Sequence, residues 1–127
     1  MPRLAAFVCF GLFIVVASLT PVAVSAGEAD VVAVRAEKQG PERWSFTVTV
    51  AHADKGWDHY ADRFEILGPD GAVLGTRILA HPHADEQPFT RSLGNVWVPG
   101  HIRAVTVRAG DKVHGFGGKT KEVALGN

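Results

Sequence analysis

The chain has 127 residues, with 13 basic and 13 acidic side chains, and its single cysteine is Cys9. This balance gives no positive surplus of the kind that a nucleic-acid-binding protein or a protein of anionic membranes needs. The length suits one domain with a single hydrophobic core.

The first 26 residues have the features of a secretory signal peptide. Arg3 supplies the short positive start, residues 4–19 are almost wholly apolar, and Val24–Ser25–Ala26 provides the small residues that precede a cleavage site. The apolar run is shorter than the roughly 20 residues of a membrane-spanning helix, so cleavage is favoured over retention as an uncleaved anchor. We therefore expect cleavage after Ala26, a mature domain of residues 27–127, and a periplasmic or secreted location.

The mature chain shows the period-two alternation of β-strands rather than a helical period. The clearest example is Trp44, Phe46, Val48 and Val50, which would share one face of a strand while polar residues take the other. A similar pattern predicts that Tyr60 is the first inward-facing residue of the next strand. The seven expected strands cover residues 31–37, 44–50, 60–67, 73–80, 89–93, 103–108 and 122–125.

Turn-forming residues separate these strands. Gly68–Pro69–Asp70–Gly71 predicts a tight turn, because proline fixes φ and glycine tolerates positive φ. Seven short strands with turns at this spacing predict an all-β, seven-stranded antiparallel sandwich of the immunoglobulin or fibronectin type. Because Cys9 falls in the expected leader, the mature domain would lack the disulfide of true immunoglobulin domains and would be stabilised by packing alone.

All six histidines follow residue 26, and the expected topology brings five of them to one end of the sandwich. Consecutive antiparallel strands reverse direction, so the second–third, fourth–fifth and sixth–seventh loops share an end, which we call the His-rich pole. These loops carry His52, His59, His81, His83 and His114. The opposite end receives His101. The acidic and aromatic residues of the same three loops are Asp54, Trp57, Asp58, Asp85, Glu86 and Asp111.

His81–Pro82–His83 is the sharpest local motif at the His-rich pole. The residue before a proline favours an extended backbone, so both imidazoles would face one side, about 7 Å apart. Such a pair could hold one metal ion together with a third ligand from His52, His59 or His114. Nitrogen and oxygen ligands, without a mature cysteine or methionine, favour Cu(II) or Zn(II) over Cu(I). The alternative is a polar network of histidines that organises the loops.

The segment Gly56–Trp57–Asp58–His59–Tyr60 allows two interpretations. Exposed aromatic side chains dominate binding surfaces, so Trp57, Asp58 and Tyr60 could contact a ligand or partner together with Asp85 and Glu86. In the other interpretation, Trp57 folds over the open end of the core as a cap. We favour the cap, because a sandwich without disulfides needs buried aromatic area.

Two motifs with catalytic associations are not supported. The run GFGGKT at residues 115–120 resembles a phosphate-binding loop, but that pattern requires a first glycine where this chain has Val113. Its glycines would instead shape a loop between two edge strands. The two mature serines, Ser45 and Ser92, do not lie in a G-x-S-x-G elbow. No catalytic residues are therefore predicted.

Residues 56–65 (GWDHYADRFE) and 74–93 (LGTRILAHPHADEQPFTRSL) resemble a group of small exported bacterial proteins of uncharacterised activity. That resemblance covers most of the mature chain and implies a periplasmic β-domain without assigned site residues. The mature chain is also similar to periplasmic copper carriers of the CopC type, which are small exported sandwiches. Those carriers use a histidine at the mature N-terminus, whereas this chain would begin with Gly27.

The sequence therefore predicts an exported, single-domain binding protein rather than an enzyme. The His-rich pole would be its contact surface, with Cu(II) or Zn(II) as the leading ligand. The alternative is a structural or accessory module that binds another envelope protein through the same pole. No nucleic-acid partner is expected, and no membrane contact beyond the leader.

Overall fold

The computed structural model describes residues 27–126, so the expected leader lies outside the described residues and its cleavage stays a prediction. Within residues 27–126 the secondary structure is entirely β, and no helix is present that could cross a membrane. The strands are β1 (Asp30–Gly40), β2 (Arg43–Ala51), β3 (Ala61–Leu67), β4 (Val73–Ile78), β5 (Phe89–Trp97), β6 (Ala104–Asp111) and β7 (Lys121–Ala124).

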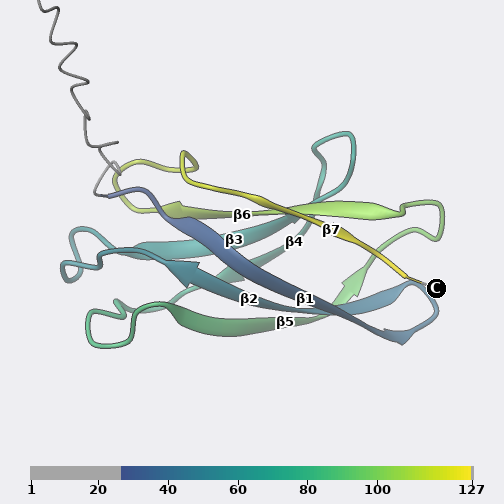
Figure 1. Ribbon diagram of the computed structural model, residues 1–127, viewed down its shortest axis with the longest axis horizontal. Helices are drawn as coiled ribbons and strands as arrows, with labels where there is room; N and C mark the ends of the chain where they lie inside the picture. Colours follow the sequence, from purple (N-terminus) through teal and green to yellow (C-terminus); the bar gives the residue numbers. More distant parts are fainter. Residues whose placement is uncertain (1–26, 127) are drawn as a thin grey trace, which may run out of the picture.

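The strands form two antiparallel sheets that face each other (Figure 1). One sheet has the order β1-β2-β5 and the other has the order β4-β3-β6-β7. The order is not sequential, because the chain passes from one sheet to the other after β2, after β4 and after β5. The prediction of an all-β, seven-stranded antiparallel sandwich is confirmed.

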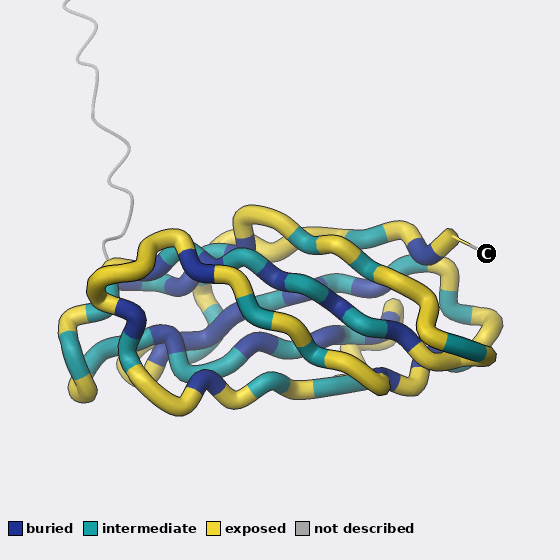
Figure 2. Tube along the Cα trace, turned by 90° about the horizontal axis from the view of Figure 1, so that it is seen from below, coloured by how far each residue is buried: buried dark blue, intermediate teal, exposed yellow. Residues whose placement is uncertain are grey.

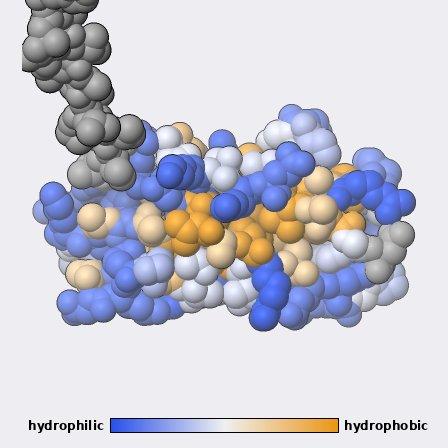
Figure 3. Space-filling view, in the orientation of Figure 1, coloured by the Kyte–Doolittle hydropathy of each residue, from blue (hydrophilic) through white to orange (hydrophobic). Residues whose placement is uncertain are grey.

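The core lies between the two sheets and consists mainly of phenylalanine and valine. Phe46 of β2, Phe64 of β3 and Phe89 of β5 are each no more than 1% exposed. Buried and more exposed positions alternate along the strands, which is visible in Figure 2 as alternating colours. Each sheet therefore buries the inward face that the period-two pattern predicts. Figure 3 shows that hydrophilic residues dominate both ends of the molecule, while apolar surface lies along the middle of the face in view.

One strand is longer than the sequence pattern indicates. β5 continues past residue 93 to Trp97, although Gly94 and Asn95 have the composition of a turn. They form a bulge instead: the pairing with β2 shifts register here, and Asn95 has a positive φ of 56°. The Asn95 amide donates a hydrogen bond to Gln39 Oε1 at 2.9 Å, which satisfies a donor that the bulge removes from the ladder.

The start of β3 differs from the expectation by one residue. The strand begins at Ala61, and Ala61 rather than Tyr60 is the buried residue there. A register shift between Ala61 and Arg63 in the pairing with β6 moves the inward-facing position. The prediction that Tyr60 faces the core was therefore wrong, because a bulge adds one residue to the alternation.

The β2–β3, β4–β5 and β6–β7 loops lie at one end of the molecule, together with the beginning of β1 (left in Figure 1). The other reversals and the C-terminus lie at the opposite end. The β6–β7 loop is fastened to the beginning of β1, because the Lys119 amide donates to Asp30 Oδ1 at 2.7 Å and the Val31 amide donates to the Lys119 carbonyl at 2.8 Å. This end is the His-rich pole.

Candidate metal centre

His52 reaches the centre of the His-rich pole because it continues the inward-facing row of β2. Trp44, Phe46, Val48 and Val50 all face the core, and His52 is the next position in that alternation. Its side chain is fully buried. The strand therefore delivers an imidazole to the place where the apolar core ends.

β6 delivers a carboxylate to the same place from the other sheet. Val105, Val107 and Ala109 face the core, and Asp111 is the next inward position, 1% exposed. His59 enters from the loop before β3, two residues ahead of the buried Ala61, with its side chain 18% exposed. Two different sheets thus supply the polar groups that close the core.

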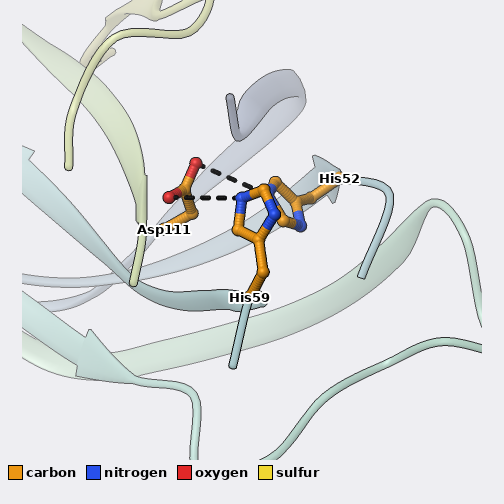
Figure 4. A group of neighbouring side chains, drawn as sticks. All are labelled: His52, His59 and Asp111. Carbon is orange, nitrogen blue, oxygen red and sulfur yellow. Dashed lines mark ion pairs between the residues drawn. The ribbon is translucent and has the colours of Figure 1, made fainter. Parts of the chain in front are cut away.

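The side chains of His52, His59 and Asp111 converge (Figure 4). His52 Nε2 lies 3.4 Å from Asp111 Oδ2, and His59 Nε2 lies 3.6 Å from Asp111 Oδ1. One ligand atom from each residue lies within 4.8 Å of the other two. Two ligands bound at about 2.0–2.1 Å from a tetrahedral zinc ion lie about 3.3 Å apart, so both His–Asp distances are close to those of a metal site.

A backbone oxygen completes the convergence. The Gly27 carbonyl oxygen lies 2.8 Å from His52 Nε2 and 3.0 Å from His59 Nε2. Gly27 is buried and continues inward from Ala29 and Val31 of the β1 segment. Four chain segments, two from each sheet, therefore meet around one point.

Asp54 contacts the His52 ring at Nδ1, the nitrogen opposite the one that faces Asp111. The Asp54 carboxylate is fully buried. The same carboxylate accepts hydrogen bonds from the amides of Ala61 at 3.1 Å and His83 at 2.6 Å. A carboxylate only accepts, so the Asp54 contact places a proton on Nδ1, and Nε2 faces two further acceptors, the Gly27 carbonyl oxygen and the Asp111 carboxylate. This carboxylate–histidine arrangement is the usual support of a metal-binding imidazole.

Asp111 is held in its charged form. Burial by itself would raise the pKa of Asp111, but amide donors from His114 and Val113 outweigh burial and keep that pKa below its usual value of 3.8. The Val113 amide lies 2.8 Å from Oδ1, and His114 Nδ1 lies 3.1 Å from Oδ2. A fixed negative charge therefore stands at the centre of the cluster at neutral pH.

His114 forms the side of the cluster that faces solvent. Its side chain is 40% exposed, and its ring lies 5.0 Å from the His59 ring. Its Nδ1 shares Asp111 Oδ2 with the buried groups. His114 is the most exposed of the three histidines in this cluster.

The structure places His81 and His83 beside the converging group but not in it. Their ring centroids are 4.6 Å apart, and His81 is exposed. The His83 ring stacks on Phe89 with centroids 4.0 Å apart and planes 10° apart. His83 Nδ1 lies 3.9 Å from Asp54 Oδ2, and neither ring nitrogen of His83 has a hydrogen-bond partner among the described residues. Burial, followed by the charge of Arg91, lowers the pKa of His83.

The predicted partner-contact residues lie around this centre, mostly exposed. Trp57 is 63% exposed and contacts Tyr60 edge-to-face at 5.8 Å. The expectation that Trp57 caps the core was therefore wrong: His52 and Asp111 occupy that position. The remaining predicted contact residues are the exposed Asp58, Asp85 and Glu86.

From the sequence alone, Asp54 and Asp111 are acidic neighbours of the histidines, and neither these two residues nor Gly27 is predicted to be a ligand. A signal was present for Asp111, since extending the inward-facing row of β6 beyond the last valine reaches this residue. For Asp54 and Gly27, only the three-dimensional arrangement shows the contact.

The chain is similar to a protein of Halomicrobium mukohataei named "Putative lipoprotein", with 41% identity over 96 residues. The alignment covers 76% of this chain and 47% of the relative, so the chain spans about half of that protein's length. No family model matches the chain, and no solved structure matches it significantly.

Proposed function

We propose that this protein is exported and binds one divalent metal ion, Cu(II) or Zn(II), at the His-rich pole. The ligands are His52, His59 and Asp111, and His114 is available from the solvent side. Asp54 orients His52 and does not contact the ion.

The observation that carries the proposal is that two imidazole nitrogens, one carboxylate and one backbone carbonyl oxygen face one another at a single point. His52 Nε2 faces the Gly27 carbonyl oxygen at 2.8 Å and a carboxylate oxygen of Asp111 at 3.4 Å, and both of these oxygens only accept hydrogen bonds. Acceptors that face each other at such distances repel unless a positive group lies between them. A divalent ion fills this role, and a second proton on His52 would compete with it.

The donor set indicates the kind of ion. Imidazole nitrogen suits copper and zinc, and Asp111 adds one hard oxygen ligand. Three protein ligands would leave a coordination position toward His114 and solvent. The site therefore fits Cu(II) or Zn(II) better than the all-oxygen ions Mg²⁺ and Ca²⁺.

Export is supported by two independent features. The sequence has the composition of a signal peptide over residues 1–26. The Halomicrobium mukohataei relative has the word lipoprotein in its name, which fits an envelope-associated protein.

Titration of the purified exported protein with Cu(II) and Zn(II) tests the proposal. We expect one equivalent to bind, and we expect His59→Gln to weaken binding by about tenfold or more. His101→Gln is the matched control, because His101 is exposed and belongs to the β5–β6 connection, which lies at the opposite end of the molecule (Figure 1). Binding no tighter than that of an unstructured histidine peptide would overturn the proposal, as would equal losses in the two variants.

One observation favours the alternative, an accessory module that binds an envelope protein through the same pole. Trp57 and Val113 lie on adjacent loops and are 63% and 60% exposed, and Lys112 Nζ donates to the Trp57 carbonyl at 2.9 Å, which joins the loops. Exposed aromatic residues are frequent binding anchors. Loss of a co-purifying envelope protein in Trp57→Ala, with metal binding unchanged, would support this alternative.

A further inference from the structure

We infer that removal of the leader creates a ligand of the metal site: the free α-amino group of Gly27. The inference deepens the proposed function and rests on it. It also uses the predicted cleavage after Ala26, which makes Gly27 the first residue of the mature chain.

The contacts of Gly27 fix its position at the cluster. Its carbonyl oxygen lies 2.8 Å and 3.0 Å from the Nε2 atoms of His52 and His59. Backbone bond lengths place the nitrogen of a residue within about 3.6 Å of its own carbonyl oxygen, whatever the torsion angles. The Gly27 nitrogen therefore lies within about 6.6 Å of both Nε2 atoms.

A second contact places Gly27 against the open side of the cluster. A Cβ atom built on Gly27 would lie 2.6 Å from His114 Cε1 and 3.1 Å from His59 Cε1. The Gly27 backbone also has a φ of +141°, a conformation that other L-residues rarely adopt. Only glycine fits between the two rings without displacing them.

The cleavage reaction changes the chemistry of this nitrogen. Hydrolysis adds hydroxide to the Ala26 carbonyl carbon and a proton to the Gly27 nitrogen, so a carboxylate and an amine replace the peptide bond. The amide nitrogen before cleavage is conjugated with its carbonyl and is a poor metal ligand. The amine has an accessible lone pair once a proton leaves, because α-amino groups have pKa values of about 7.7–8.0. A divalent ion that binds it releases that proton to solvent.

The amine and the carbonyl oxygen of one residue can bind the same ion. Together with the ion, they close a five-membered ring through the glycine Cα and carbonyl carbon. The structure already holds the Gly27 oxygen at the cluster, so one of the two atoms that would chelate the ion is in place. The mature chain would then bind metal through His52, His59, Asp111 and its own first residue.

The test compares two forms of the full chain that are exported with their own leader. One is the natural sequence, and the other has a threonine inserted between Ala26 and Gly27. Cleavage after Ala26 then leaves one extra residue, which moves the free amine away from the site. Intact mass identifies the N-terminus of each purified protein, and thermal unfolding shows that both are folded. Cu(II) affinity is then measured for each protein.

We expect the natural form to begin at Gly27 and to bind Cu(II) about tenfold or more tightly than the threonine form. We also expect [15N]glycine labelling to change the nitrogen hyperfine pattern of bound Cu(II) in the natural form only. Affinities within twofold of each other, an unchanged hyperfine pattern, or a different N-terminus would overturn the inference.

His59→Gln separates the two claims. If this variant loses Cu(II) while the threonine form retains full affinity, the proposed metal site stands and the amine is not a ligand. If the natural form binds no Cu(II) beyond an unstructured histidine peptide, both claims fail.

Discussion

Asp54 and Asp111 lie against opposite nitrogens of the same imidazole. The Asp54 carboxylate contacts His52 Nδ1, and Asp111 Oδ2 lies 3.4 Å from His52 Nε2. Both carboxyl side chains are fully buried. Two buried carboxylates in such proximity require a positive group between them, either a proton on His52 or a metal ion. Replacing each carboxylate separately by an amide distinguishes their roles.

Asp111→Asn is expected to weaken Cu(II) and Zn(II) binding by about tenfold or more, because it removes a charged ligand. The asparagine oxygen can still accept the amides of Val113 and His114, so the loop should keep its conformation. Titration calorimetry measures the affinity. Asp58→Asn is the control, since Asp58 is exposed at the same pole. Equal affinities for the two variants would contradict a ligand role for Asp111.

Asp54→Asn is expected to act on both stability and binding. The Asp54 carboxylate accepts hydrogen bonds from His52 and from the backbone amides of Ala61 and His83. An asparagine side chain has one oxygen in place of two, so one of these buried donors loses its acceptor, which costs about 1–3 kcal/mol of stability. Metal affinity should fall by about 10–100-fold, because His52 loses its orienting group. Urea unfolding and metal titration measure the two effects. The exposed Asp85→Asn should change neither.

His83 should make the fold less stable in mild acid. Burial, followed by the charges of Arg91 and His81, lowers its pKa below 6.5, and these effects outweigh the opposing charges of Asp54 and Glu86. The unfolded chain therefore takes up a proton at this residue at a higher pH than the folded chain. The contribution of His83 is complete above pH 6.5 and decreases as the pH falls toward its folded pKa.

His83→Phe tests this pH dependence. Phenylalanine can keep the stacking on Phe89 and removes two buried ring nitrogens that lack hydrogen-bond partners among the described residues. The free energy of unfolding in urea, measured between pH 5 and pH 7.5, should decline less toward acid in the variant. Parallel curves for the two proteins would show that His83 does not titrate differently in the folded state.

Trp57→Ala is expected to leave stability within about 0.5 kcal/mol of the natural protein, because the side chain is 63% exposed. Phe64→Ala is the comparison, since Phe64 is fully buried and its removal should cost about 3–5 kcal/mol. Urea unfolding measures both. A large loss in Trp57→Ala would restore the role of Trp57 as a cap of the core.

Gly118→Ala should destabilise the fold by about 1–3 kcal/mol. A Cβ on Gly118 would lie 2.0 Å from the Ala29 carbonyl oxygen, so the β6–β7 loop and the start of β1 would have to separate. Gly40→Ala is the control, because a Cβ there meets no atom within 4 Å. A thermal melt compares the variants, and similar melting temperatures would show that this close approach is not needed for stability.

The strands were predictable because alternation is a local property of the sequence. Phe46 and Val48 face the core for the reason that their spacing indicates. The bulge at Asn95 was not predictable, since Gly94–Asn95 has the composition of a turn and only pairing with β2 keeps the strand intact. The same holds for Gly27, whose contact with His52 depends on how the two sheets are placed.

The gathering of histidines at one end of the fold was predictable, but the arrangement of their side chains within the His-rich pole was not. Strand direction alone brings His59 and His114 to the same end. Whether a histidine points inward depends on bulges and loop conformations, so His83 packs on Phe89 while His52 faces Asp111. These choices arise from long-range packing, which no spacing along the chain encodes.

The two sheets contribute equally to the candidate site: Gly27 and His52 adjoin β1 and β2, whereas His59 and Asp111 adjoin β3 and β6. An ion bound there would cross-link the halves of the sandwich, as a disulfide does in many exported domains, within residues 27–126, which contain no cysteine. At a metal concentration 100 times the Kd, such a cross-link contributes about 2.7 kcal/mol. Resistance of the fold to heat and proteases would then follow the supply of metal in its surroundings.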